Sequence, residues 1–191
     1  MKRAFDALLA LVALFFLSWT FLIIFFAVRL TSDGPAIYWS DRVGKNNTLF
    51  SMPKFRTMYV GTPEVASHLL LDSKERLTSI GGFLRKSSLD ELPQLLSILK
   101  GDMSFVGPRP ALYNQDDLIA MRTERGVHQL LPGLTGLAQV RGRDKLSVIQ
   151  KVELDKDYLF RRSFFFDIKI IFMTIFEIFK KRTSFNESRS K

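Results

Sequence analysis

The sequence predicts a small α/β domain that is held on a membrane by its two ends. Three observations support this prediction. A long apolar segment lies near the start of the chain, short strand-like runs with polar turns follow it, and a phenylalanine-rich segment with a basic end lies near the end. The 191 residues suit one domain with appendages, because domains commonly contain ~100–200 residues.

The first element is an apolar segment from Ala7 to Val28 that contains no charged residue. At about 1.5 Å per residue, this segment can cross ~30 Å of hydrocarbon as a helix. It is too long for the apolar core of a cleaved signal peptide, and no cleavage site of small residues follows it before Arg29. We therefore expect residues 1–30 to form a permanent membrane helix.

The charges around this helix favour a re-entrant topology over a spanning one. Basic residues stand on both sides of it, at positions 2, 3, 29 and 42. A helix that enters a leaflet, bends and returns leaves both basic ends on the same side of the membrane. The first 34 residues contain no proline. Ser18 can bend the helix by bonding back to a carbonyl one turn earlier, but more weakly than a proline would, so a spanning helix stays the alternative.

Residues 31–162 are expected to form the folded domain. Residues 36–40 and 49–52 read as short strands joined by a polar turn at residues 44–47. Lys54 and Arg56 then alternate with Phe55. This alternation is typical of an exposed basic strand face.

The central run of the chain, residues 87–110, holds two adjacent acidic residues. Ser88 is a good N-cap with Glu91 three residues later, which is the spacing of a capping box. Pro93 fits only in the first helical turn, and leucines then recur at helical spacing until Gly101. The sequence therefore predicts a helix that begins at Asp90.

Two interpretations of this acidic pair are open. Acidic residues at a helix start are favoured by the macrodipole, by about 0.3–1 kcal/mol each. Alternatively, the carboxylate of Asp90 can attack phosphorus while its neighbour Glu91 holds a hard cation such as Mg²⁺. The rigid turn from Gly107 to Pro110 presents Arg109, whose guanidinium fork suits phosphate.

The second half contains helices and one glycine-rich loop. Polar helices are expected from Tyr113 to Gly126 and over residues 146–160. Between them, the glycines of residues 132–136 precede Arg141 and Arg143. Glycines let backbone amides approach an anion and arginines add charge, which is a weak signal for a phosphate-binding loop.

Residues 163–182 are expected to form an amphipathic helix in the membrane interface. The segment is rich in Phe and Ile, carries Asp167, Thr174 and Glu177 near one side, and ends in a basic cluster at residues 180–182. Such a cluster suits anionic lipid. A core helix is the alternative, and the polar residues 183–191 are expected to form a disordered tail.

The composition narrows the classes of partner. The formal net charge of +9 and the pI near 9.9 suit anionic partners: a membrane face, phosphate-rich substrates or nucleic acid. The chain has no cysteine, so disulfides and cysteine-based zinc sites are excluded. Nucleic-acid binding is disfavoured by the apolar segment and by the lack of a recognisable DNA- or RNA-binding module.

Several of these runs together resemble a known family. They are Lys54–Met58, Ser88–Gln94, Lys100–Pro110 and Pro132–Arg143, in this order along the chain. The resemblance is to the bacterial sugar transferases, the small monotopic phosphoglycosyl transferases that start lipid-linked glycan assembly. It covers nearly the whole chain, from about residue 3 to about residue 180.

The resemblance implies transfer of a phosphosugar from a UDP-sugar to polyprenyl phosphate, with release of UMP. Asp90 would form a covalent aspartyl–phosphosugar intermediate, and Glu91 would be the second catalytic residue and the ligand of Mg²⁺. Six basic residues would bind substrate, Arg109 foremost: Arg109, Arg85, Lys54, Arg56, Arg141 and Arg143. The domain would lie on the cytoplasmic face of the bacterial inner membrane and begin the assembly of a capsule, O-antigen, exopolysaccharide or glycoprotein glycan.

Two other functions compete with this one. A membrane-tethered basic scaffold would use the acidic pair only as a helix start, so Asp90→Asn would change none of its behaviour. A magnesium-dependent lipid phosphatase would share the carboxylates but release inorganic phosphate. The shared motifs specify neither the sugar nor the pathway, and the phenylalanine-rich ends are compatible with a homo-oligomer.

Overall fold

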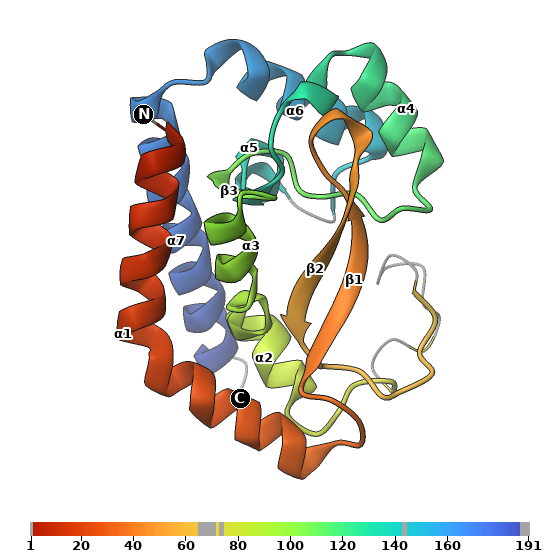
Figure 1. The fold of residues 1–191 in the computed structure, drawn as a ribbon, viewed down its shortest axis with the longest axis vertical. Coiled ribbons are helices and arrows are strands. Elements are labelled where there is room, and N and C mark those ends of the chain that lie inside the picture. Colours follow the sequence, from red (N-terminus) through yellow and green to blue (C-terminus); the bar gives the residue numbers. More distant parts are fainter. Residues whose placement is uncertain (1, 65–71, 73–74, 143–144, 188–191) are drawn as a thin grey trace.

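A computed structural model describes residues 2–64, 72, 75–142 and 145–187. The fold combines helices with two small sheets, as predicted for a mixed α/β domain (Figure 1). Two long helices, α1 (Lys2–Thr31) and α7 (Phe164–Glu187), form one side of the molecule. The antiparallel hairpin of β1 (Ile37–Val43) and β2 (Leu49–Phe55) forms the other side, and α3 (Gln94–Lys100) lies between them.

The remaining elements connect these layers. The 3₁₀ turns are η1 (Lys45–Asn47), η3 (Leu89–Glu91) and η4 (Val127–Gln129). The short strands are β3 (Ser104–Val106) and β4 (Gly133–Thr135), and the other helices are α2 (Gly81–Ser87), α4 (Asp116–Glu124), α5 (Leu137–Arg141) and α6 (Val148–Arg161).

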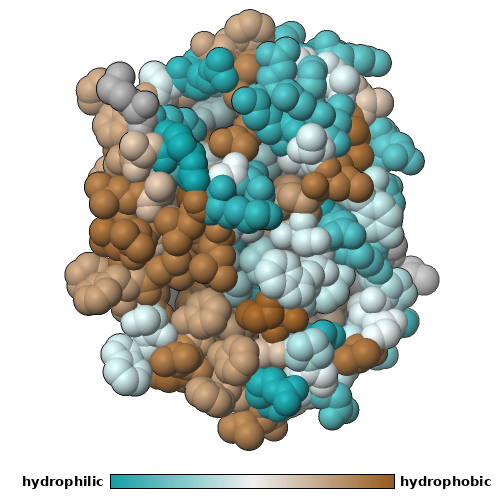
Figure 2. Space-filling model, in the orientation of Figure 1, coloured by the Kyte–Doolittle hydropathy of each residue, from teal (hydrophilic) through white to brown (hydrophobic). Residues whose placement is uncertain are grey.

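Helix α1 contains the whole predicted apolar segment, and its length and composition would allow it to cross a membrane. Most of its large apolar side chains face outward. Phe15, Phe16 and Trp19 are each about three-quarters exposed, at 76%, 75% and 76%. On the face drawn in Figure 2, the surface over α1 is consequently strongly apolar, whereas the surface over the hairpin and α4 is largely polar.

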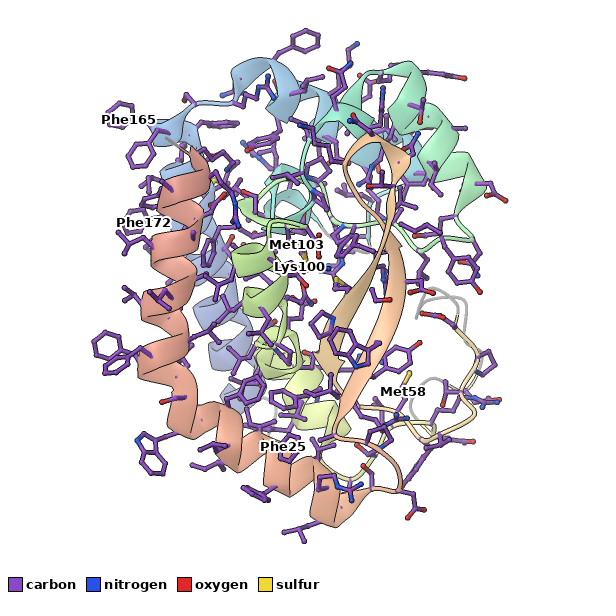
Figure 3. The ribbon with its side chains drawn as sticks, in the orientation of Figure 1. Phe25, Met58, Lys100, Met103, Phe165 and Phe172 are labelled. Carbon is purple, nitrogen blue, oxygen red and sulfur yellow. The ribbon has the colours of Figure 1, made fainter. Side chains whose placement is uncertain are left out.

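Both ends of α1 pack against the folded domain. Near its start, Ala10 is buried with Ile98 of α3 in one core cluster. Near its end, Val28 is buried with Phe55 of β2 in another. Between these contacts the helix changes direction, and Phe25 lies on the part of α1 that follows the bend (Figures 1 and 3). Ser18 Oγ donates a hydrogen bond of 2.8 Å to the carbonyl of Phe15, the type of contact expected to bend the helix.

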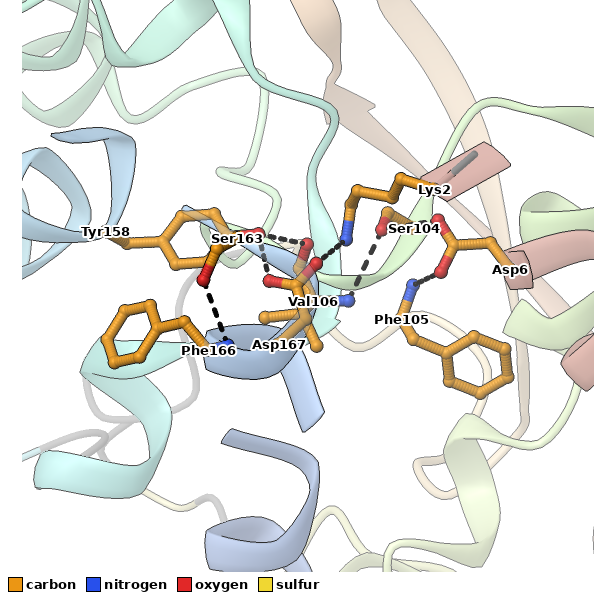
Figure 4. Close-up of polar contacts among 9 residues, drawn as sticks. All are labelled: Lys2, Asp6, Ser104, Phe105, Val106, Tyr158, Ser163, Phe166 and Asp167. Atoms are coloured by element: carbon orange, nitrogen blue, oxygen red, sulfur yellow. Dashed lines mark hydrogen bonds and ion pairs between the residues drawn. The ribbon is translucent and has the colours of Figure 1, made fainter. Parts of the chain in front are cut away.

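A polar cluster fixes the first turns of α1 to the rest of the molecule (Figure 4). Lys2 Nζ lies 2.5 Å from Asp167 of α7, and the Tyr158 hydroxyl donates to the same carboxylate at 2.7 Å. Asp6 accepts a bond of 2.8 Å from Ser104 Oγ of β3. Asp6 and Asp167 are buried, so these charges need the partners that the cluster provides.

Helix α7 has features of both predicted alternatives, an amphipathic helix and a core helix. Ile170 is fully buried in a core cluster, whereas Phe165 and Phe172 are exposed at 83% and 59% and lie on the side of α1 (Figure 3). One face is thus part of the core and the other is an exposed apolar face. The helix continues to Glu187, so the boundary predicted at residue 182 lies inside it. The end of the predicted tail, residues 188–191, lies outside the described residues.

The helix start predicted at Asp90 is present only as a short 3₁₀ turn, and the capping box predicted between Ser88 and Glu91 is wrong. Ser88 has a left-handed backbone (φ 58°) and makes no side-chain cap, and it is both the C-cap of α2 and the residue that precedes η3. The acidic pair lies in the 3₁₀ turn η3, and α3 begins only after Pro93. The reason is packing, because Leu89 lies against the cluster around Phe55 and this contact overrides the local capping preference.

The loop predicted at residues 132–136 contains a strand. Here β4 pairs in parallel with β3, which joins the central run of the chain to its second half. The expected helix of residues 113–126 is confirmed in part, as α4 followed by a 3₁₀ turn. The helix expected over residues 146–160 is confirmed as α6, and it begins with a capping box between Ser147 and Gln150.

Candidate active site

A cavity of about 180 Å³ lies between the hairpin, the segment that follows β2, and the acidic pair. Tyr38, Ser40 and Arg42 alternate along β1, so all three side chains reach this cavity. Its other lining residues include Lys54, Arg56, Glu64, Arg85 and Asp90. The cavity therefore brings cationic side chains from the first half of the chain next to a carboxylate of the central run.

Asp90 is 8% exposed and reaches the cavity from η3. Burial, reinforced by the charge of neighbouring Glu91, raises the pKa of Asp90 from 3.8 to about 6, while Lys54, Arg109 and Arg85 oppose the shift. The carboxylate is therefore mainly ionised at neutral pH, and it is more basic than an ordinary aspartate. Both properties suit a nucleophile.

Glu91 is held by two cations that meet at one oxygen. Arg109 Nη2 donates a hydrogen bond of 2.7 Å to Glu91 Oε1, and Lys54 Nζ lies 3.5 Å from the same atom. Burial lowers the pKa of Lys54 to about 8, while Glu91 acts to raise it. The ammonium is thus mainly protonated at neutral pH, and its charge reaches both the acidic pair and the cavity.

Arg42 is a functional candidate that the sequence analysis did not select. Its Nε donates to Ser40 Oγ at 2.9 Å, and its Nη1 lies 3.4 Å from the carbonyl oxygen of Pro110. Burial, with the nearby charge of Arg109, lowers the pKa of Arg42 to about 10. The signal was present in the sequence, because strand alternation places Arg42 on the same face as Tyr38 and Ser40.

The structure brings most of the predicted site residues together. Contacts join Glu91 to Lys54 and Arg109, and Arg56 and Arg85 line the same cavity as Asp90. Arg56 also donates a hydrogen bond of 2.8 Å to the carbonyl of Pro35.

The two arginines expected after the glycine-rich loop are placed differently. Arg141 ends α5, is exposed and is not one of the residues that line the cavity. Arg143 lies outside the described residues.

The acidic pair fits a magnesium site only if a substrate completes it. Within the part of the chain that the structure describes, no three His, Cys, Asp or Glu side chains form a metal cluster. Magnesium is commonly bound by one or two carboxylates, with substrate phosphates and water as its remaining ligands. Asp90 supplies a carboxylate at the cavity, and Glu91 supplies a second one next to it in η3.

The charges in and beside the cavity favour an anionic ligand. Five cationic groups lie in or beside the cavity with three carboxylates, namely Arg42, Lys54, Arg56, Arg85 and Arg109 with Glu64, Asp90 and Glu91. Such an excess of positive charge stabilises phosphate oxygens, and a buried carboxylate among them can attack a phosphorus atom.

Comparison with known proteins identifies relatives along almost the entire chain. The family described as bacterial sugar transferase matches residues 1–181. A sugar transferase of Bacillus subtilis, EpsL, whose function is uncharacterized, is 43% identical over 92% of this chain and 85% of its own length.

Two longer relatives have names that state an activity. The undecaprenyl-phosphate galactose phosphotransferase of Salmonella typhimurium is 38% identical over 91% of this chain and 39% of its own length. The UDP-glucose:undecaprenyl-phosphate glucose-1-phosphate transferase of Escherichia coli is 37% identical over 97% of this chain and 41% of its own length. The chain thus spans well under half the length of either relative.

Proposed function

Because this chain belongs to the bacterial sugar transferase family, we propose that it transfers a phosphosugar from a UDP-sugar to polyprenyl phosphate and releases UMP. The observation that supports this reaction best is the buried Asp90, which reaches a cavity lined by cations. The names of the Salmonella and Escherichia relatives describe transfer of this kind to undecaprenyl phosphate.

In the first step, the ionised carboxylate of Asp90 attacks the β-phosphorus of the donor. An Asp90 oxygen–phosphorus bond forms, the bond between the phosphorus and the bridging oxygen breaks, and UMP leaves with that oxygen. In the second step, an oxygen of the lipid phosphate attacks the same phosphorus and releases Asp90. The raised pKa of Asp90 supports this role, since a more basic carboxylate is a better nucleophile.

The cations stabilise the negative charge that moves between these groups. Lys54 and Arg109 hold Glu91 beside the nucleophile, and Arg85 lines the cavity with Asp90. Cations that are fixed in advance beside a buried carboxylate stabilise developing charge more strongly than mobile ions in bulk water.

Magnesium is part of this proposal. Glu91, with Asp90 beside it, would hold the ion, and substrate phosphate and water would complete its ligands. When bound, it neutralises diphosphate oxygens and assists departure of UMP.

The placement of the cavity fits a reaction between a soluble donor and a membrane lipid. We place the apolar faces of α1 and α7 in the cytoplasmic leaflet of the bacterial inner membrane, with α1 re-entrant. The support for this placement is the exposed apolar surface over α1 together with the packing of both ends of α1 on the same domain (Figure 2). The cavity would then open to the cytoplasm close to the lipid headgroups.

The decisive experiment measures UMP release from a panel of UDP-sugars with Mg²⁺ and polyprenyl phosphate. We expect one or two sugars to give UMP, and we expect Asp90→Asn and EDTA each to abolish it. Asp102→Asn is the matched control, because Asp102 pairs with Lys100 at 3.0 Å and is not one of the cavity-lining residues. Its rate should stay within about twofold of wild type, because Asp102 does not line the cavity.

Three other outcomes would contradict the proposal. Release of UDP in place of UMP would mean ordinary glycosyl transfer without an aspartyl intermediate. Release of inorganic phosphate from the lipid would favour a phosphatase. No turnover of any donor by folded, membrane-bound protein would favour the scaffold.

A further inference from the structure

The turn that carries Arg109 has few backbone N–H groups with which to hydrogen-bond to the rest of the fold. Proline has no backbone N–H group, so Pro108 and Pro110 leave this turn with few donors of its own. Its position must therefore be fixed mainly through its carbonyl groups.

Each of these carbonyls accepts a hydrogen bond from a different part of the fold. The Pro108 carbonyl accepts from the amide of Gly133 in β4 at 2.8 Å. The Arg109 carbonyl accepts from Arg122 Nη1 of α4 at 2.8 Å, and the Pro110 carbonyl accepts from Arg42 Nη1 of β1 at 3.4 Å. Of these three donors, the Arg122 side chain is the one that acts on Arg109 itself.

The guanidinium of Arg122 is fixed in one orientation. Its Nε and Nη2 atoms donate to Asp155 Oδ2 at 3.0 and 2.6 Å, which leaves Nη1 directed at the Arg109 carbonyl. The side chains are 11% and 2% exposed, so neither charge can turn away into water without losing a buried partner. The planar fork of the guanidinium thus joins α6 to the Arg109 turn.

Fixing this turn matters because the Arg109 side chain is long and 40% exposed. Its 2.7 Å bond to Glu91 Oε1 forms only if its backbone is held at the right distance from η3. A shift of about 1 Å in a group that positions substrate can lower a rate by on the order of 100-fold.

We propose that Arg122, oriented by Asp155, is a positioning residue that sets the Arg109 guanidinium against Glu91 and the substrate phosphate. This inference deepens the proposed function and rests on it. Arg122 itself touches neither the acidic pair nor, in the proposed reaction, the reacting phosphorus. The competing explanation is that the Arg122–Asp155 pair only fastens α4 to α6.

A second ion pair provides a matched control for that explanation. Arg125 caps the end of α4 and pairs with Glu153 of α6, and both side chains are partly exposed. Arg125→Met removes the same charge from the same pair of helical segments without touching the Arg109 turn. Methionine preserves most of the apolar stem of arginine in both variants.

The test measures kcat and KM for the donor in wild type, Arg122→Met, Arg125→Met, Arg109→Met and the Arg109/Arg122 double variant. We expect Arg122→Met to lower kcat/KM by on the order of 100-fold, and Arg125→Met to stay within about twofold of wild type. In the Arg109→Met background, adding Arg122→Met should cost less than about threefold, because Arg122 acts through Arg109. Multiplicative losses, or equal losses in Arg122→Met and Arg125→Met, would overturn the inference.

A double variant separates loss of positioning from loss of folding. Arg122→Met leaves Asp155 buried without its partner, so Arg122→Met with Asp155→Leu supplies a variant in which an apolar pair replaces the ions. It should unfold close to the wild-type midpoint and still turn over slowly; recovery of wild-type kcat/KM would overturn the inference.

The affinity for inorganic pyrophosphate, measured by calorimetry, separates this inference from the proposed reaction. If wild type turns over no donor, the proposed reaction fails. Even then, Arg122→Met should bind pyrophosphate about tenfold more weakly than wild type and Arg125→Met. Equal affinities, or no binding by wild type, would overturn the positioning role.

Discussion

At the scale of single residues, the unusual feature of the site is that Asp90 is ionised in a place that penalises charge. The folded-state pKa of about 6 lies above the unfolded value of 3.8. The ionised carboxylate therefore costs stability, and the cost is present in full above about pH 6 and disappears as the pH falls toward 3.8. Keeping Asp90 ionised as a nucleophile thus lowers the stability of the folded protein.

Asp90→Asn should therefore stabilise the protein while it abolishes turnover. A shift of about two pKa units corresponds to on the order of 3 kcal/mol, so we expect the free energy of unfolding at pH 8 to rise by about 2–3 kcal/mol. The gain should shrink toward zero near pH 4, where wild-type Asp90 is protonated. Denaturant unfolding in detergent micelles at both pH values measures this difference.

The control for this prediction is Asp33→Asn, which removes an exposed carboxylate from the loop after α1. Its free energy of unfolding should stay within about 0.5 kcal/mol of wild type at both pH values. A less stable Asp90→Asn protein at pH 8 would show that the charge of Asp90 is stabilised by its cations more than it is penalised by burial.

At the scale of elements, the Arg109 turn is positioned by glycines that let two backbones approach closely. Gly107 directly follows β3, Gly133 is the first residue of β4, and Gly136 directly follows β4. A Cβ at Gly136 would lie 2.0 Å from the Gly107 carbonyl oxygen, and a Cβ at Gly133 would lie 2.1 Å from the Gly107 amide nitrogen. No larger residue fits there without moving the backbone that leads into Pro108.

Gly136→Ala should consequently reduce both stability and activity. Forcing a methyl group against a backbone oxygen in a packed site costs about 1–3 kcal/mol, and the resulting shift moves the Arg109 turn. We expect a lower unfolding midpoint and a lower kcat/KM for the donor, measured on the same preparation.

Gly82→Ala is the matched control, because it also adds one methyl group to a glycine. Outside the backbone of its own helix α2, the nearest neighbour of the added methyl group would be Leu77 Cδ1 at 3.8 Å, which is an ordinary contact. Alanine is favoured in helices by up to about 1 kcal/mol, so this variant should be at least as stable as wild type. Equal losses in the two variants would refute the close-approach argument.

At the scale of the whole molecule, the arrangement of α1 supports the re-entrant anchor that we propose. Lys2 and Asp6 at one end contact α7 and β3, and Val28 at the other end lies in a core cluster of the same domain. A helix that crossed the bilayer would separate one of these ends from the domain. The bend in α1 allows both contacts to form while its outer face stays apolar (Figures 1 and 2).

Labelling of single cysteines can test this topology, since the chain has no native cysteine. Ala4 and Asp33 are exposed residues near the two ends of α1. In sealed inverted membrane vesicles, a membrane-impermeant maleimide should label both Ala4→Cys and Asp33→Cys if α1 is re-entrant with its ends in the cytoplasm. Labelling of one position only, with the other reached after detergent is added, would indicate a spanning helix.

The sequence by itself determined those features that depend on neighbouring residues. The apolar run of α1, the alternation in the hairpin and the capping box of α6 are local patterns, and the acidic pair lies within a recognisable run. The tertiary structure alone decided how distant segments meet: Lys54 and Arg109 at Glu91, Arg122 at the Arg109 turn, and β3 beside β4. These contacts join residues far apart in the chain, and strands of three residues carry too little periodicity to predict. At Ser88 the packing of Leu89 outweighed a good capping signal, because burial of apolar side chains stabilises the fold more than one helix cap.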